Sequence, residues 1–264
     1  MIDGAAPNSM RPMRKADRFG RILERLAQDG SVAVAELAAE LGVSQATVRR
    51  DLHALGDQRL LERAHGGAVS QGTIYELPVR YRSSHARAEK QRIAAAAAAR
   101  VQDGEVVALT GGTTTTEVAR GLLDRTGLSV VTNALNIAAE LAIRPNLKLV
   151  VTGGVARSAS YELVGPLAES TLRTINIDIA FVGVDGIDAR AGLTTQNETE
   201  AATNRVLIER SRRVVVVADA TKLGRVAFAS ICGLSEVGEL ITDSAADPEQ
   251  LERLRSAGLV CTTV

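Results

Sequence analysis

The chain has 264 residues, and its 31 basic and 31 acidic side chains give a formal net charge of zero. The length fits one large domain or two modest ones, because single hydrophobic cores stop growing at roughly 250–300 residues. The balanced charge excludes a polybasic tail, a highly charged nucleic-acid coat and an acidic disordered tail. Hydrophobic content is 45%, but aromatic residues make up only 2% and tryptophan is absent. The core must therefore be aliphatic, and a sugar site built on tryptophan platforms is excluded.

Several classes of protein are excluded by what the chain lacks. Its two cysteines, Cys232 and Cys261, and its three histidines cannot supply a zinc cluster or a disulfide framework, although one disulfide stays possible. We expect no metal and no cofactor. No apolar run approaches the ~18 residues of a membrane span, so we expect no membrane partner. Residues 1–14 contain prolines and arginines without an apolar segment, which predicts a disordered leader and a cytoplasmic protein.

Charge is distributed unevenly along the chain. Residues 1–92 hold fifteen basic and eleven acidic side chains, whereas residues 93–264 hold sixteen and twenty. The neutral total thus combines a segment of net charge +4 with one of −4. Such asymmetry suggests a nucleic-acid partner for the first segment.

Residues 15–70 have the pattern of a helix-turn-helix domain. Apolar residues recur at helical spacing from Arg18 to Ala27, and Asp29-Gly30 ends that run. Ser31–Val34 is too short to be predicted as more than an extended connector. A second helix is expected over Ala35–Leu41, and Gly42-Val43-Ser44 then turns the chain into a third helix over Gln45–Leu55. Two short helices joined in this way are typical of a helix-turn-helix, whose second helix enters the DNA major groove.

The third helix has an apolar face and a polar N-terminal end. Arginine can pair bidentately with guanine and glutamine with adenine, so this end suits base edges and phosphates. An arginine pair at a solvated helix start is the simpler alternative, but the glycine turn and the short preceding helix favour DNA. The DNA contacts that we expect from this helix are Ser44, Gln45, Thr47, Arg49 and Arg50.

Leu60–Val69 is predicted to form a small β-hairpin, or wing. Gly66-Gly67 could make its turn or let the backbone approach a phosphate closely. The wing would place Arg63, His65 and Gly66 beside the DNA backbone. An exposed loop position without function is the alternative for His65.

The segments SQATVRRDLHAL and LERAHGGA together resemble the signature of the DeoR family of bacterial transcriptional regulators. The resemblance covers roughly Lys15–Ser70 and implies a winged helix-turn-helix in which Arg49 and Arg50 contact DNA. Asp51 is expected to orient an arginine or the fold, because a carboxylate is repelled by DNA. Residues 71–92 lack periodicity and are predicted to be a basic linker, with charges that are solvated or lie near DNA phosphate.

Residues 93–264 alternate between strand and helix patterns. After an alanine-rich helix, strands are predicted at Glu105–Leu109, Leu128–Thr132, Leu147–Thr152, Ile179–Val184, Val214–Ala218, Glu239–Ile241 and Leu259–Thr263. Helices are predicted at Glu117–Leu123, Leu135–Ala142, Leu167–Thr174, Glu198–Ser211 and Pro248–Ala257. Apolar strands with crossover helices indicate an α/β domain with a mostly parallel sheet covered on both faces. In such sheets, ligands bind at the carboxyl ends of the strands.

Polar residues accumulate at these strand ends. The Gly-Gly-Thr-Thr run between a strand and a helix would aim backbone N–H groups at an anion, above all a phosphate, and Lys222 would add positive charge. The run is neither a Walker loop nor a dinucleotide fingerprint. Each strand end alone could be ordinary turn chemistry, but together they predict one small-molecule site. Its expected residues are Gly111, Gly112, Thr113, Thr114, Thr115, Asn133, Gly153, Gly154, Asp185, Glu198 and Lys222.

The DeoR resemblance continues through this region, over about residues 87–243, in segments such as GGTTTTEVA, ELVGPLAE and ADATKLG. It implies a sensor domain related in fold to ribose-5-phosphate isomerase and the CoA transferases, which binds a phosphorylated sugar and alters DNA affinity. The family commonly has Asp-Ser-Gly where this chain has Thr110-Gly111-Gly112. The resemblance thus implies that the phosphate cradle is kept, whereas it does not carry over the sugar-hydroxyl contact of that aspartate, so an unusual ligand is expected. Within the family, the resemblance is weakly in favour of the sub-branch that handles amino-sugar or sugar-alcohol phosphates, as judged from the segments GLTTQNETEA and ADATKLG.

We therefore expect a DNA-binding regulator, most often a repressor in this family, of a carbohydrate operon. Its partners would be double-stranded operator DNA, a phosphorylated sugar effector and further copies of itself, as a dimer or tetramer. The alternative is a sugar-phosphate isomerase, with acid–base groups drawn from Asp185, Asp188, Glu198, Glu200 and Lys222. An architectural DNA-binding protein is a third hypothesis, but it leaves the polar strand ends unexplained.

Overall fold

The computed structural model describes residues 13–70, 79 and 86–264. Most of the expected leader (residues 1–12) and of the expected linker (residues 71–78 and 80–85) lies outside the described residues. The chain divides into two compact units, residues 1–85 and residues 86–264. Each unit has its own hydrophobic core and is described by itself below.

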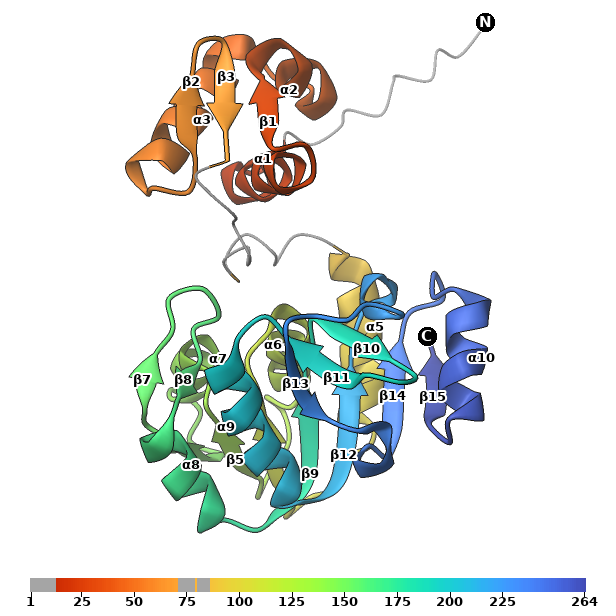
Figure 1. Ribbon diagram of the computed structural model, residues 1–264. Coiled ribbons are helices and arrows are strands. Elements are labelled where there is room, and N and C mark those ends of the chain that lie inside the picture. The colour runs from red at the N-terminus through yellow and green to blue at the C-terminus, as the bar shows by residue number, and fades with distance from the viewer. Residues whose placement is uncertain (1–12, 71–78, 80–85) are drawn as a thin grey trace, which may run out of the picture. The chain divides into compact units, whose positions relative to one another are not determined.

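Within residues 13–70, the first unit consists of helices and a small sheet (Figure 1). In chain order the elements of residues 13–70 are α1 (Lys15–Asp29), β1 (Ser31–Ala33), α2 (Val34–Leu41), α3 (Gln45–Asp57), β2 (Glu62–Ala64) and β3 (Gly67–Val69). The helices are amphipathic, and their apolar faces meet around Ile22, Leu37 and Leu55. The expected helices and hairpin are therefore present, each helix being one to three residues longer at one or both ends.

One expectation for this unit is wrong, because Ser31–Ala33 is a strand. It pairs antiparallel with β3, so that Val32 lies opposite Ala68 and Ala33 opposite Gly67. The resulting sheet has the order β1-β3-β2. Three residues are too few to show the period of two by which a strand is recognised, so only its partner reveals it.

The second unit is built on a seven-stranded sheet with the order β15-β14-β12-β9-β4-β5-β6. All the strand pairs in it are parallel. The strands are β4 (Val106–Leu109), β5 (Ser129–Thr132), β6 (Lys148–Val151), β9 (Ile177–Val182), β12 (Ser211–Val217), β14 (Glu239–Thr242) and β15 (Val260–Thr263). These are the seven predicted strands, with ends that differ by up to three residues.

Helices cover both faces of this sheet, as predicted (Figure 1). On one face, Val107, Leu109 and Phe181 pack against α5 (Arg87–Ala98), α6 (Thr113–Gly121) and α7 (Leu135–Leu141). On the other, Ala108 and Val182 pack against α8 (Pro166–Arg173), α9 (Glu198–Glu209) and α10 (Pro248–Ser256). Alternate residues of one strand thus enter different cores, which explains the unbroken apolar runs.

Two helices begin earlier than predicted. The helix α5 begins at Arg87, so Arg87–Arg92 are not linker, and Lys90 in its first turn is buried. The helix α6 begins at Thr113, so Thr113–Thr116 form its first turn and not a loop before it. Polar or β-branched residues at helix starts weaken the helical pattern there, which accounts for both errors.

Short antiparallel strands were not predicted. They are β7 (Val155–Ala156), β8 (Leu163–Val164), β10 (Gly186–Asp188), β11 (Gly192–Thr195) and β13 (Ala229–Cys232). The last three form a sheet of order β10-β11-β13 that packs within the same core as α9. Both cysteines are free thiols. None of the described helices is long and apolar enough to cross a membrane.

Candidate DNA interface and effector site

The recognition helix α3 is held to the first unit by its apolar face and by one ion pair. Val48 and Leu55 are fully buried. The Arg18 guanidinium donates to both carboxylate oxygens of Asp51, at 2.7 and 3.2 Å. That hydrogen bond raises the pKa of Arg18 against the opposing effect of burial. Asp51 therefore orients an arginine of α1, as expected, and fixes the position of α3 on α1.

The residues expected to contact DNA lie at the free end of α3. Ser44 caps the helix, because its hydroxyl accepts a hydrogen bond from the Thr47 amide at 3.2 Å. Gln45, Arg49 and Arg50 are exposed, and Thr47 is half-buried. Arg49 donates to the Gln45 side chain at 3.3 Å. Because this hydrogen bond is exposed and long, Arg49 can give it up for a hydrogen bond to a base edge or a phosphate at little cost in free energy.

The wing is formed by β2 and β3, and it exposes Arg63, His65 and Gly66. Gly66 has a φ of +76°, so it makes the turn. Gly67 has a different role, because a Cβ there would lie 2.0 Å from the carbonyl oxygen of Val32. Gly67 therefore permits the pairing of β1 with β3, while the exposed turn at Gly66 leaves its backbone accessible.

In the second unit, the N-terminus of α6 follows the carboxyl end of β4. Its N-cap, Gly112, has a φ of +131° and no capping side chain. The Thr115 and Thr116 hydroxyls donate to the Gly112 carbonyl at 3.0 and 2.6 Å. The first amides of a helix lack partners within the helix, and here Thr113, Thr114 and Thr115 supply them. This arrangement suits an anion.

Glu162 is a buried carboxyl group beside this helix start. Its segment pairs with the exit of β5, because the Leu163 amide donates to the Asn133 carbonyl at 2.7 Å. The side chain then reaches the backbone of Gly111, where a Cβ would lie 2.3 Å from Glu162 Oε1. Glu162 Oε2 accepts from the Nδ2 atoms of Asn133 and Asn204 at 3.2 and 3.4 Å. Burial, followed by the charge of Glu200, raises the pKa of Glu162 to about 8.

A second group of charges follows the carboxyl end of β9. The Thr195 hydroxyl lies 3.1 Å from Asp185 Oδ2 and 3.2 Å from Glu200 Oε2. Arg157 pairs with Glu200. Lys222 Nζ lies 3.9 Å from Asp185 Oδ1. Since the Glu200 charge acts on Glu162, the two groups form one polar cluster, which consists of Gly111, Asn133, Arg157, Glu162, Asp185, Thr195, Glu200, Asn204 and Lys222.

Asp219, at the carboxyl end of β12, extends the cluster towards α5. Burial acts to raise the pKa of Asp219, but the Thr221 hydrogen bond and the charges of Lys222 and Lys90 lower it overall. Asp219 is therefore held ionised between two lysines. The buried Lys90 lies in the segment that was expected to be linker, so the sequence offered no reason to place it here.

The structure brings together some of the expected effector residues and separates others. Gly111, Asn133, Asp185 and Lys222 belong to the polar cluster, and Gly112–Thr115 form the adjoining helix start. Glu198 is exposed at the first position of α9 and accepts a hydrogen bond from Asn197. Gly153 and Gly154 follow the edge strand β6, and a Cβ at Gly154 would meet Val164 at 2.8 Å. Glu198 thus lies at a helix start, and Gly153 and Gly154 form a turn.

The residues that sequence reasoning did not assign to this site are Lys90, Arg157, Glu162, Thr195, Glu200 and Asn204. Glu200 was considered only as an acid–base group of the alternative enzyme. Asp188, also considered there, accepts from the backbone of Arg190 and Ala191 in a turn. A weak signal was present for Thr195 and Glu200, since both lie in the segment GLTTQNETEA.

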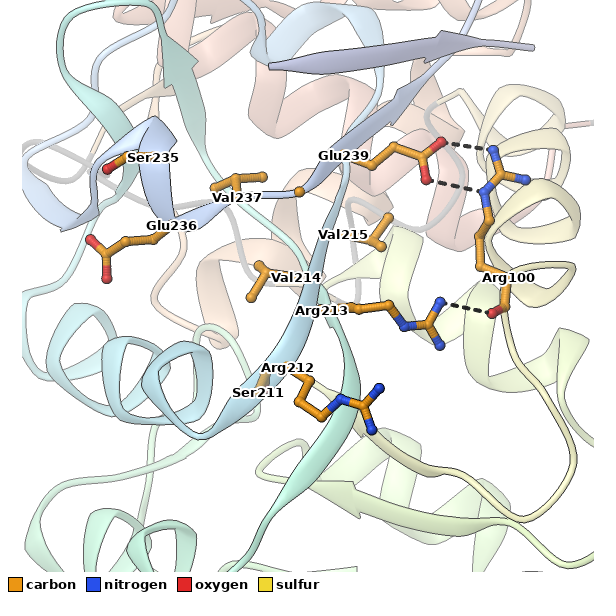
Figure 2. Close-up of a pocket in the computed structure, with 11 residues that line it drawn as sticks. Arg100, Ser211, Arg212, Arg213, Val214, Val215, Ser235, Glu236, Val237 and Glu239 are labelled. Carbon is orange, nitrogen blue, oxygen red and sulfur yellow. Dashed lines mark hydrogen bonds and ion pairs between the residues drawn. The ribbon is translucent and has the colours of Figure 1, made fainter. Parts of the chain in front are cut away.

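A cavity of about 420 Å³ lies at the opposite ends of the strands, lined by the starts of β12 and β14 and by Arg100 (Figure 2). Its arginines face carboxylates. Arg100 donates to Glu239 at 3.0 and 2.7 Å, and Arg213 donates to Glu105 at 2.6 Å. The Arg100 hydrogen bond lowers the pKa of Glu239. These pairs neutralise the cavity, so the anion-binding features are those of the carboxyl ends.

The first unit is a winged helix-turn-helix, and the second is a parallel α/β unit with a polar cluster at its strand ends. Together they have the architecture of a two-domain transcriptional regulator. Comparison with known families agrees in both parts. Residues 18–73 match the DeoR-like helix-turn-helix domain, and residues 85–244 match the DeoR C terminal sensor domain. The chain belongs to the DeoR family of transcriptional regulators.

Curated relatives match along nearly the whole chain. The HTH-type transcriptional regulator GlpR of Haloferax volcanii is 38% identical over 94% of this chain and 97% of its own length. A putative aga operon transcriptional repressor of Escherichia coli O157:H7 is 37% identical over 98% and 97%. The glycerol-3-phosphate regulon repressor of Escherichia coli K12 is 33% identical over 88% and 92%.

Solved structures are more distant. The sorbitol operon regulator SorC of Klebsiella pneumoniae is 14% identical, with a TM-score of 0.42, over 91% of this chain and 99% of its own. Ribose 5-phosphate isomerase A of Methanocaldococcus jannaschii is 20% identical, with a TM-score of 0.39, over 52% of this chain and 54% of its own. The family assignment rests on the sequence matches.

Proposed function

We propose that this protein is a repressor of a carbohydrate-metabolism operon and that a phosphorylated sugar, bound in the second unit, changes its affinity for operator DNA. One observation supports the proposed effector site most strongly. The N-terminus of α6, which has no capping side chain, lies next to a polar cluster that contains Lys222. Relatives named as repressors of the aga operon and of the glycerol-3-phosphate regulon support the same class of function.

In the first unit, the proposed base contacts come from Gln45, Arg49 and Arg50, with Ser44 and Thr47 near the phosphates. Arg63, His65 and Gly66 of the wing would contact the backbone of the DNA. All of these residues are exposed or half-buried. Base contacts set sequence preference, and phosphate contacts set the register on the duplex.

In the second unit, the phosphate would lie at the N-terminus of α6, on the amides of Thr113–Thr115, with Gly112 allowing close approach. Lys222 and Lys90 would supply positive charge, and Asn133 and Asp185 would face the sugar. Phosphate oxygens are strong acceptors and suit both the helix amides and the lysines. We propose no effector contact for Glu198, Gly153 or Gly154.

We propose a regulator without isomerase activity, because Asp185 and Glu200 share a hydrogen-bond donor and are each paired with a cation. A coupled isomerase assay on ribose 5-phosphate checks this, and we expect no turnover. Turnover that disappears in Asp185→Asn would instead support an enzyme.

The repressor is proposed to act as a dimer or tetramer, since one helix-turn-helix reads only a short half-site. Because the protein is proposed to bind operator DNA, we also propose that it acts in the cytoplasm. Light scattering of the purified full chain tests the assembly, and a monomer at micromolar concentration would contradict it.

The proposed ligand class is tested by a thermal-shift panel of phosphorylated sugars and their unphosphorylated counterparts. A ligand that binds only the folded state raises the unfolding temperature by mass action. We expect stabilisation by at least one phosphorylated sugar and none by its unphosphorylated form. The stabilisation should be lost in Lys222→Ala and kept in Lys148→Ala, a lysine on the exposed edge strand β6. Stabilisation that is the same in both variants would contradict the site.

A further inference from the structure

Glu162 borders the proposed phosphate position without having been assigned a role there. Only 4% of the residue is exposed, and its carboxyl group fills the place that a side chain at Gly111 would take. Gly111 immediately precedes the N-cap of α6. A group attached to the sugar close to its phosphate would therefore meet this carboxyl group.

A buried hydrogen-bond acceptor beside Glu162 lacks a donor. Asn133 is fully buried and its Nδ2 donates to Glu162, but its Oδ1 has no hydrogen-bond partner. The Thr195 hydroxyl lies within hydrogen-bond distance of both Asp185 and Glu200, and the Gln196 amide also donates to Asp185 at 3.3 Å. A buried acceptor without a donor costs free energy, so a ligand that brings several donors is favoured.

The negative charges around Glu162 outnumber the positive ones. The carboxyl groups of Glu162, Asp185 and Glu200 meet two cations, Arg157 and Lys222. If all three were ionised, the cluster would carry a net charge of −1. Buried net charge is costly, and the raised pKa of Glu162 indicates that this carboxyl takes up a proton when nothing else balances it.

We propose that Glu162 is a specificity-determining residue that selects a phosphorylated effector carrying a primary ammonium group. This inference rests on the proposed function, because it takes the phosphate to lie at the N-terminus of α6. An ammonium group has three donors, no acceptor and one positive charge, which match the Glu162 carboxylate and Asn133 Oδ1. A hydroxyl group in its place supplies one donor, adds lone pairs and leaves the charge unbalanced.

Proton release accompanies such binding. Glu162 faces Glu200 and Asp185 as like charges, Arg157 and Lys222 as the cations paired with them, and the amides of Asn133 and Asn204. Without ligand, Glu162 is mainly protonated at pH 7, and the arriving ammonium favours its ionised form, so the proton passes to solvent. Calorimetry in buffers of different ionisation enthalpy should show about one proton released for an ammonium ligand, and close to none for its hydroxyl counterpart.

The test compares matched ligands by titration calorimetry of the full chain. Glucosamine 6-phosphate and glucose 6-phosphate form one pair, galactosamine 6-phosphate and galactose 6-phosphate the other, and N-acetylglucosamine 6-phosphate keeps the nitrogen without its charge. We expect one amino sugar phosphate to bind at least about tenfold more tightly than its hydroxyl partner, a difference of about 1.4 kcal/mol. The N-acetyl compound should bind no better than glucose 6-phosphate.

Variants assign the preference to Glu162. Glu162→Gln keeps the side-chain shape and should reduce the preference to within about threefold while leaving the binding of the hydroxyl sugar phosphate in place. Glu162→Asp keeps the charge and should retain part of the preference. Glu198→Gln makes the same change at an exposed carboxylate outside the cluster and should leave it intact.

Each result bears on a different statement. Equal affinity for both members of each pair in the wild-type protein, or a preference that persists in Glu162→Gln, overturns the role of Glu162 and leaves the proposed function standing. If none of the phosphorylated sugars, and none of a wider panel, binds the wild-type protein, the proposed function fails and this inference fails with it.

Discussion

At the scale of single residues, Asp51 shows how a conspicuous acidic residue can serve DNA binding without touching DNA. Its carboxylate is nearly buried and receives two hydrogen bonds from Arg18. Asp51→Asn should destabilise the first unit by about 2 kcal/mol, because a partly buried guanidinium loses its charged partner. The loss of stability is measured by urea unfolding, monitored through the hydrogen exchange of residues 15–70. Asp57→Asn, at an exposed carboxylate of the same helix, should change little.

Glu162 gives the second unit a dependence on pH. Its folded-state pKa of about 8 lies above its ordinary value of 4.5, so the folded protein binds the proton more tightly than the unfolded chain. The contribution of Glu162 to stability is therefore fully present below its ordinary pKa of 4.5, and it is lost as the pH rises from there through the folded-state pKa of about 8. The second unit should unfold at a lower temperature at pH 8 than at pH 6, and Glu162→Gln should reduce that difference. An unchanged pH dependence in the variant would contradict the burial of an ionisable group at this position.

At the scale of elements, the strand β1 depends on a glycine in its partner strand β3, which lies four elements later in the chain. A methyl group at Gly67 would collide with the Val32 carbonyl oxygen, whereas one at Gly66 would meet no atom within 4 Å. Gly67→Ala should weaken the pairing of β1 with β3 by about 1–3 kcal/mol, which speeds amide exchange in both strands by roughly fivefold or more. Gly66→Ala should strain only its own turn, at a cost of about 1 kcal/mol. Equal effects of the two variants on exchange in β1 would show that the close contact is unimportant.

The elements that could be predicted from the sequence are those with a strong local pattern. The inner strands of the parallel sheet are buried on both faces and appear as unbroken apolar runs, and the number of parallel strands and their order along the chain were predicted correctly. The strands β1 and β13 depend on partners distant in the chain, whereas β7, β8, β10 and β11 are too short to show an alternating pattern. The start of α5 was missed because arginines and a lysine dominate Arg87–Arg92, although Lys90 is buried.

Some residues of the candidate site could likewise be predicted from local sequence patterns, and others could not. Residues that follow a strand within a few positions, such as Asn133 after β5 and Asp185 after β9, could be placed because parallel strands end at one edge of the sheet. Glu162 could not, because its position depends on a loop that pairs with the exit of β5 and on the absent side chain of Gly111. Arg157 and Asn204 join the cluster only through the packing of that loop and α9.

At the scale of the whole molecule, the two units should be separable by mutation. Arg49→Ala combined with Arg50→Ala removes two exposed charges from α3 and should weaken operator binding by at least about thirtyfold, since bidentate base contacts contribute ~1–3 kcal/mol each. Ligand-induced stabilisation should be unchanged in this double variant. The control is Arg173→Ala together with Arg212→Ala, which removes two arginines from the second unit. Loss of both activities in the α3 variant would indicate misfolding.

The most direct test of the account is an anisotropy titration of DNA from the protein's own promoter region, with and without the sugar phosphate that stabilises the protein most. A ligand changes DNA affinity only as far as it distinguishes two states of the protein, and typical couplings of 1–3 kcal/mol correspond to about 5–150-fold. We predict a shift within this range for the wild-type protein, with Lys222→Ala binding the same DNA at unchanged affinity and without a shift. Wild-type affinity that is the same with and without ligand would contradict the account.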